Sequence, residues 1–227
     1  MKNKSYIGIS FIILLFGIYA IPKIVNRVKN GTVVQNDRMS VATETAIDTS
    51  LVKIKAAPKF EFTDQNNQKI NNTTYLGKVY VVEFFFTSCP SICPIMNKNM
   101  ALIQNEFINN TNFGIASITI NPENDTPQVL KKYAADYGAL SPNWHFLTGN
   151  KDTIYKMATE GFKQYVGQND KANGGFEHSG LFALIDKNGM VRCRSDENNN
   201  PIMYYDGLEK TGVEAIKQDI KILLKEK

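Results

Sequence analysis

The sequence predicts an α/β fold in which a central mixed sheet is flanked by helices. Apolar, strand-like segments alternate with helix-like segments, and one central segment is apolar on both faces. Strands that alternate with helices form a mostly parallel sheet covered on both sides. Near the C-terminus an Asn-Gly turn joins two more strand-like segments. Such a turn connects antiparallel neighbours, so the sheet is expected to be mixed.

The expected strands are rich in β-branched and aromatic residues. Residues 79–86 are apolar almost throughout, which is typical of a strand buried on both faces. The other expected strands span residues 59–64, 113–120, 144–148, 181–185 and 190–194. The last two form a hairpin across Asn188-Gly189, since this pair adopts the positive φ angles of a tight turn.

Four helices are expected between these strands and at the C-terminus. They span residues 96–107, 127–137, 152–165 and 212–227. The second has the clearest boundaries, because Thr126 precedes Pro127 at the first helical position and Gly138 ends the segment. We expect Asp125 to help start this helix.

The net charge of +4 is concentrated at the N-terminus. Residues 1–30 hold five of the 26 basic residues and no acidic one, so the rest of the chain is close to neutral. A nearly neutral domain has no basic surface to attract phosphate backbones. Nucleic-acid binding is therefore excluded.

An apolar segment near the N-terminus predicts a membrane anchor. Residues 5–22 contain no charge, and a run of this length just suffices to cross a bilayer as a helix. A cleaved signal peptide is the alternative, although the run is longer than a usual signal core. We therefore expect an N-terminal transmembrane helix within residues 1–29, a linker over residues 30–57 and one domain over residues 58–227.

Two cysteines follow the central strand directly, in the segment FTSCPSICP. Cys89 and Cys93 are four residues apart, a spacing that places both side chains on one face of a helix. A helix N-terminus lowers the pKa of a thiol, and thiolates are soft ligands that suit Cu(I) and Zn(II). The pair is therefore expected to bind one metal ion or to form a disulfide.

The chain contains only two histidines, and they differ in their surroundings. His145 lies inside an expected strand and is expected to be packed or hydrogen-bonded. His178 follows a glycine-rich loop and precedes the strand at 181–185. A terminal antiparallel hairpin and helix added to a parallel α/β core is the thioredoxin-like arrangement, so this is the fold expected here. In that arrangement the strand entry lies against the cysteine-bearing helix start. His178 is therefore the expected third ligand.

Four segments in order resemble the Sco/SenC family of copper chaperones. They are FFFTSCPSICP, NPENDTPQVLKKYA, NWHFLTG and EHSGLFALIDKNG, and the resemblance covers roughly residues 55–227 together with the N-terminal anchor. It implies a thioredoxin-like fold that binds one copper ion, as Cu(I) or Cu(II), through Cys89, Cys93 and His178.

The resemblance also implies a partner and a location. Family members assist assembly of the binuclear copper centre in cytochrome c oxidase subunit II, by delivering copper or by keeping its cysteines reduced. Other copper chaperones or thiol reductants are further expected partners. Lysine greatly outnumbers arginine, and there is no arginine-rich presequence. We therefore expect a protein of the bacterial inner membrane, with its soluble domain facing the periplasm.

Three positions depart from the family pattern or lie outside it. Asn121 stands where the family often has aspartate, so the sequence leaves the role of an acid there in doubt. Glu177 either orients the His178 ring as an acceptor or is an exposed surface acid. Cys193 is expected to be a thiol without a role in the site.

The main alternative is a membrane-tethered thiol–disulfide oxidoreductase that uses Cys89 and Cys93 as its redox pair. The C-x-x-x-C spacing argues against it, as does the lack of any proline between Pro142 and Pro201 to serve as a substrate-holding cis-proline. Thiol peroxidases carry a different pattern before their cysteine. A structural zinc site needs four ligands, whereas the sequence offers three. We therefore expect a metallochaperone, with reductase activity left open as a side activity.

Overall fold

The computed structural model describes residues 14–16, 18, 19, 21, 22, 51–169, 171 and 174–226. The chain divides into two units, Met1–Arg38 and Met39–Lys227. All described residues of the first unit are helical. Within the described residues, no helix combines the length and apolar character that a membrane span requires. Most of the predicted anchor and residues 30–50 of the predicted linker lie outside the described residues.

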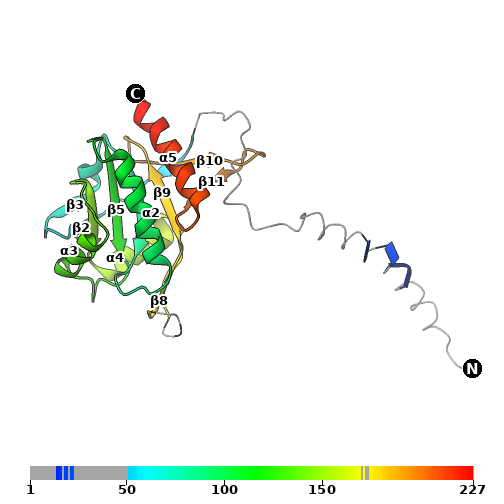
Figure 1. The fold of residues 1–227 in the computed structure, drawn as a ribbon, viewed down its shortest axis with the longest axis horizontal. Helices are drawn as coiled ribbons and strands as arrows, with labels where there is room; N and C mark the ends of the chain where they lie inside the picture. The colour runs from blue at the N-terminus through cyan, green and yellow to red at the C-terminus, as the bar shows by residue number, and fades with distance from the viewer. Residues whose placement is uncertain are drawn as a thin grey trace, which may run out of the picture. The chain divides into compact units, whose positions relative to one another are not determined.

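The second unit is built on a large mixed sheet with the strand order β1-β10-β9-β4-β5-β6-β2-β3 (Figure 1). Its central strands β4, β5 and β6 are parallel, whereas β9, β10, β1, β2 and β3 pair antiparallel with their neighbours. The main-sheet strands are β1 (Val52–Ala56), β2 (Glu61–Asp64), β3 (Lys69–Asn71), β4 (Val79–Phe85), β5 (Phe113–Thr119), β6 (Trp144–Thr148), β9 (Leu181–Ile185) and β10 (Met190–Ser195). The predicted mixed α/β architecture is confirmed.

Shorter strands and the helices complete this unit. Strands β11 (Pro201–Ile202) and β12 (Tyr205–Asp206) pair with β10 and β9, and β7 (Val166–Gln168) and β8 (Phe176–His178) form a separate two-stranded sheet. The helices are the 3-10 helix η2 (Asn72–Tyr75), α2 (Ile92–Phe107), α3 (Pro127–Asp136), α4 (Lys151–Lys156), its π-helical continuation η3 (Met157–Gly161) and α5 (Lys210–Lys225).

The linker prediction is wrong at its C-terminal end. Residues 52–56 form β1, which pairs with β10 at the edge of the sheet. The segment VKIKA alternates apolar and charged residues, which is the pattern of an edge strand. The folded domain therefore begins by residue 51, before the predicted boundary at 58.

The helix predicted over residues 152–165 ends earlier than predicted, at Gly161. A continuous helix to residue 165 is not possible, because Lys163 takes a positive φ of 54°.

The central strand β4 contacts different layers with alternate side chains. The Phe84 ring packs edge-on against Phe162, just after η3, with ring centroids 5.9 Å apart. The Phe85 ring stacks on Tyr133 of α3 at 5.3 Å. Figure 1 shows α2 and α5 together on one face of the sheet, where Lys217 of α5 pairs with Glu106 of α2. All seven residues of β4 are buried, as its apolar sequence predicts.

His145 is a structural residue, as predicted. Its Nδ1 atom lies 3.1 Å from the Asp64 carboxylate, which joins β6 to β2. The same carboxylate accepts the backbone N–H groups of Asn66 and Gln68 in the β2–β3 turn. Burial lowers the pKa of His145, because the surrounding protein disfavours its charged form. The His145–Asp64 pair thus links β6 to β2 through a polar contact inside the sheet.

Candidate metal centre

The two cysteines lie where β4 ends and α2 begins. After β4 the chain makes a turn in which the Cys89 N–H donates to the Phe86 carbonyl at 3.3 Å. Cys93 is the second residue of α2 and has no exposed surface, while Cys89 is 8% exposed. The cysteines thus occupy the carboxyl end of a central parallel strand, a common place for sites in α/β folds.

The third residue predicted for the site belongs to the separate two-stranded sheet. His178 ends β8, and its Nε2 atom lies 3.0 Å from the Cys93 sulfur. One ligand atom from each of Cys89, Cys93 and His178 lies within 4.8 Å of the other two. The structure therefore brings together the three residues selected from the sequence. His178 stands on a strand, whereas the sequence indicated only a loop and a strand entry.

The two thiols differ in their acid strength. The pKa of Cys89 is lowered to about 3, chiefly because Cys93 donates a hydrogen bond to its sulfur. The pKa of Cys93 is raised, because its proton is held by Cys89 and its sulfur is buried. Both cysteines are free. Cys89 is therefore the more acidic of the two thiols, and Cys93 holds its proton more strongly.

The imidazole of His178 is oriented for binding through Nε2. Its Nδ1 atom lies 3.0 Å from the Ser179 carbonyl oxygen, which can only accept a hydrogen bond. Nδ1 therefore carries the proton, and in the neutral ring Nε2 offers its lone pair toward the sulfurs. The Ser179 hydroxyl in turn donates to Gln164, which is 2% exposed. No sequence pattern points to Ser179 or Gln164.

Strand β8 rests on the ring of Phe86. The centroid of that ring lies 5.3 Å from Phe176 and 5.8 Å from His178. At Gly174 an added Cβ would lie 2.9 Å from the Phe86 ring and 3.1 Å from Pro90. Gly174 also has a φ of 87°, so glycine is required there by both space and conformation. The segment that carries His178 is thereby held against the cysteine turn.

Glu177 does not take the orienting role that was one of its two predicted roles, and Asp125 departs from its predicted role. Glu177 accepts a hydrogen bond from Asn169 at 2.7 Å, and the Ser179 carbonyl, not Glu177, orients His178. Asp125 is buried and binds Thr87 in the cysteine turn, while the Thr126 side chain caps α3. The prediction that Asp125 serves to start the helix is therefore wrong.

Two other predicted features are accounted for. The Asn121 carbonyl accepts the N–H groups of Asn124 and Asp125, which closes a turn without any acid at position 121. Cys193 lies on β10 opposite Val52, outside the group formed with His178. Burial raises the pKa of Cys193 to about 11, so this thiol stays protonated.

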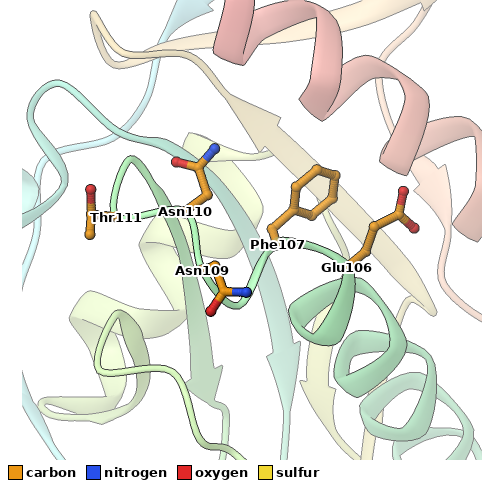
Figure 2. Close-up of a pocket in the computed structure, with 5 residues that line it drawn as sticks. All are labelled: Glu106, Phe107, Asn109, Asn110 and Thr111. Atoms are coloured by element: carbon orange, nitrogen blue, oxygen red, sulfur yellow. The ribbon is translucent and has the colours of Figure 1, made fainter.

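A pocket of about 330 Å³ lies at the opposite end of α2 (Figure 2). Glu106, Phe107 and residues 109–111 line it. Cys93 is at the first turn of α2 and Phe107 at its last residue, roughly 20 Å along the helix axis. The pocket is therefore separate from the thiols.

The cluster offers two sulfur donors and one imidazole nitrogen. Thiolates favour soft ions such as Cu(I), and imidazole suits copper and zinc. A closed zinc site requires a fourth protein ligand, and among the described residues the group has three members. The donor set thus fits a copper ion held by two sulfurs and one imidazole nitrogen.

The sequence of the chain is similar to that of a known protein family. The family model described as SCO1/SenC matches residues 49–211. The SCO1 protein homolog of Bacillus subtilis (strain 168) is 32% identical over 164 residues, which cover 71% of this chain and 79% of that protein.

Solved structures give the same result for the fold. The structure of BsSco, a member of the Sco family of cytochrome c oxidase assembly proteins with an identified disulfide switch, has a TM-score of 0.65 and 29% identity, covering 79% of this chain and 100% of BsSco. Yeast Sco1 with copper bound has a TM-score of 0.56 and 28% identity, covering 74% of this chain and 90% of the yeast chain. By its sequence and its thioredoxin-like fold, the chain belongs to the SCO1/SenC family.

Proposed function

We propose that this protein is a copper chaperone that binds one copper ion through Cys89, Cys93 and His178. The observation that carries the proposal is the convergence of two sulfurs and one imidazole nitrogen within 4.8 Å. Copper bound to yeast Sco1, at 28% identity, supports the choice of metal. The three donors leave the ion open to a partner's ligands, as a site for transfer requires.

The protonation states suggest how the residues receive the ion. Cys89 is the more acidic thiol and can bind first, whereas Cys93 gives up its proton less readily. The Nε2 lone pair of His178 lies 3.0 Å from the Cys93 sulfur and provides the third donor. Oxidation of the pair to a disulfide removes both thiolates, which couples copper binding to redox state.

The proposal includes a location and a recipient. The uncharged segment at residues 5–22 would anchor the chain in a bacterial inner membrane, with the folded unit in the periplasm. BsSco is a member of a family of cytochrome c oxidase assembly proteins, which supports the binuclear copper centre of oxidase subunit II as the recipient.

A transfer experiment tests this function. The reduced protein, loaded with copper, is mixed with the metal-free copper domain of oxidase subunit II, and both are assayed for copper after separation. We expect copper to move to the subunit II domain, and we expect protein oxidised at Cys89 and Cys93 to carry and transfer none. Copper that stays entirely on the chaperone would contradict the delivery role.

A thiol–disulfide oxidoreductase is the second candidate. One observation favours it, namely the pairing of an acidic Cys89 thiol with a buried Cys93 thiol that keeps its proton. Such a pair has one sulfur ready to attack a disulfide and a second to resolve the mixed disulfide. Reduction of subunit II cysteines without copper transfer would favour this candidate.

A further inference from the structure

Parallel strands β4 and β5 end side by side, and the loops that follow them are joined by one carboxylate. Phe85 and Thr119 are paired at the ends of the two strands, and the Ile120 N–H donates to the Phe85 carbonyl at 2.8 Å. The β4 loop carries Cys89, whereas the β5 loop carries Asp125. Asp125 has no exposed surface and faces the cysteine turn.

The Asp125 carboxylate accepts hydrogen bonds from both loops. Thr87 donates through its N–H at 3.1 Å and through its hydroxyl, so it is held at two points. On the β5 side, the Thr119 hydroxyl and the Asn124 side-chain amide also donate. In asparagine, an NH₂ group would replace one of the two accepting oxygens and would face a group that also donates. Aspartate therefore fits this position and asparagine does not.

Thr87 sits between the two halves of the metal centre. The preceding residue, Phe86, contacts the rings of His178 and Phe176. The Phe86 carbonyl accepts the Cys89 N–H two residues beyond Thr87. Holding Thr87 therefore fixes both the surface on which His178 rests and the turn that presents the Cys89 sulfur.

We propose that Asp125 is a positioning residue for the copper site, acting through Thr87 on the turn from Phe86 to Cys89. This inference rests on the proposed copper-binding function. Asp125 touches none of the three donor residues through the hydrogen bonds it makes, so it sets their geometry without being a ligand.

The test compares Asp125→Asn, Thr87→Val and the double variant in the full chain, purified with detergent. Copper affinity is measured by competition with a chelator, and the thiolate-to-Cu(II) charge-transfer absorption reports the geometry. Each single variant should bind copper about tenfold more weakly than the parent, which is a typical effect of removing a residue that orients a metal ligand. Each should also alter the absorption band. The double variant should lose no more than Asp125→Asn, because both changes break one link.

Two matched variants separate positioning from general stability. Thr87→Ser keeps the hydroxyl and should bind copper like the parent. Thr119→Val removes a donor to the same carboxylate from β5, outside the cysteine turn. It should lower the urea midpoint while leaving the affinity and the absorption band unchanged. Parent-like affinity and absorption in Thr87→Val, or equal losses in Thr87→Val and Thr119→Val, would overturn the positioning role.

A second readout does not depend on copper. The equilibrium between the Cys89–Cys93 dithiol and glutathione disulfide, which yields the protein disulfide and two glutathione thiols, reports how the two sulfurs are placed. Thr87→Val and Asp125→Asn should shift this equilibrium and Thr119→Val should not. If the parent retained no copper, the proposed function would fail. The thiol–disulfide equilibrium would still test the positioning role. An equilibrium constant equal to that of the parent in both Thr87→Val and Asp125→Asn would refute it.

Discussion

Replacing His178 with alanine will weaken the binding of Cu(II) far more than the binding of Cu(I). Two thiolates alone can hold Cu(I) in linear geometry, whereas Cu(II) prefers a larger donor set that includes nitrogen. The His178 Nε2 atom is the nitrogen in the described cluster, 3.0 Å from the Cys93 sulfur. The affinity for Cu(II) should fall by more than the factor of about 10–100 that is typical when a residue that only orients a ligand is removed.

Both affinities are measured by competition with chelators, under reducing conditions for Cu(I). The chain provides a matched control in its other histidine, because His145 bonds to Asp64 within the sheet and lies outside the cluster. His145→Gln should leave both affinities unchanged, even where it lowers stability. Equal losses of Cu(I) and Cu(II) binding in His178→Ala would contradict this division of roles among the three ligands.

Replacing Glu83 with glutamine will stabilise the protein at alkaline pH relative to the parent. Glu83 lies in the middle of β4 with no exposed surface. One carboxylate oxygen accepts from the Ser117 hydroxyl at 2.6 Å, and the other has no hydrogen-bond partner in the described part of the chain. Burial raises the pKa of Glu83 from 4.5 to about 7, because desolvation outweighs the Ser117 hydrogen bond.

The sign of the pH dependence follows from the raised pKa. Between pH 4.5 and 7 the folded protein holds a proton that the unfolded chain releases, so stability falls as pH rises through this window. Above pH 7 the buried charge lowers the stability by its full amount. This amount is about 3 kcal/mol, the free energy that corresponds to the difference between the ordinary pKa of 4.5 and the raised pKa of about 7.

Urea unfolding at pH 4.5 and pH 8.5 measures the effect. The difference in unfolding free energy between Glu83→Gln and the parent should rise by about 3 kcal/mol across this range. Glu61→Gln is the matched control, because Glu61 is exposed on β2, and its difference should stay flat. A flat difference for Glu83→Gln would show that the buried carboxylate titrates near its ordinary pKa.

The main strands and helices were predictable because their sequences are periodic or continuously apolar. β4 and β5 are buried over their full length, and most of their residues are apolar. The short strands β7, β8, β11 and β12 escaped prediction, since two or three residues carry no periodicity and become strands only through their partners. β1 does alternate, but its single pairing lies at the sheet edge.

The three residues of the Cys89, Cys93 and His178 cluster were predictable from the sequence, and the residues that hold them in place were not. Cys89, Cys93 and His178 carry the chemistry themselves, so their types and order identify them. The Ser179 carbonyl and the contact of Asp125 with Thr87 depend on which loops meet in space. No local pattern in the sequence encodes such a meeting.

The helix-terminus argument predicted a lowered pKa for both thiols, and only the pKa of Cys89 is lowered. Its largest cause is the hydrogen bond from the Cys93 side chain, which the helix-terminus argument does not include. Cys93 is closer to the helix body and fully buried, and its proton is shared with Cys89, so its pKa is raised. Spacing alone treats the two positions as equivalent, whereas burial distinguishes them.

Copper retention tests the central claim most directly. The parent and a Cys89→Ser, Cys93→Ser double variant are reduced, incubated with copper and desalted, and bound copper is measured per chain. We expect the parent to keep about one copper ion per chain and the double variant to keep none, because the thiolates are the principal donors. A parent that retains no copper yet readily reduces a model disulfide would contradict the chaperone function and identify the protein as an oxidoreductase.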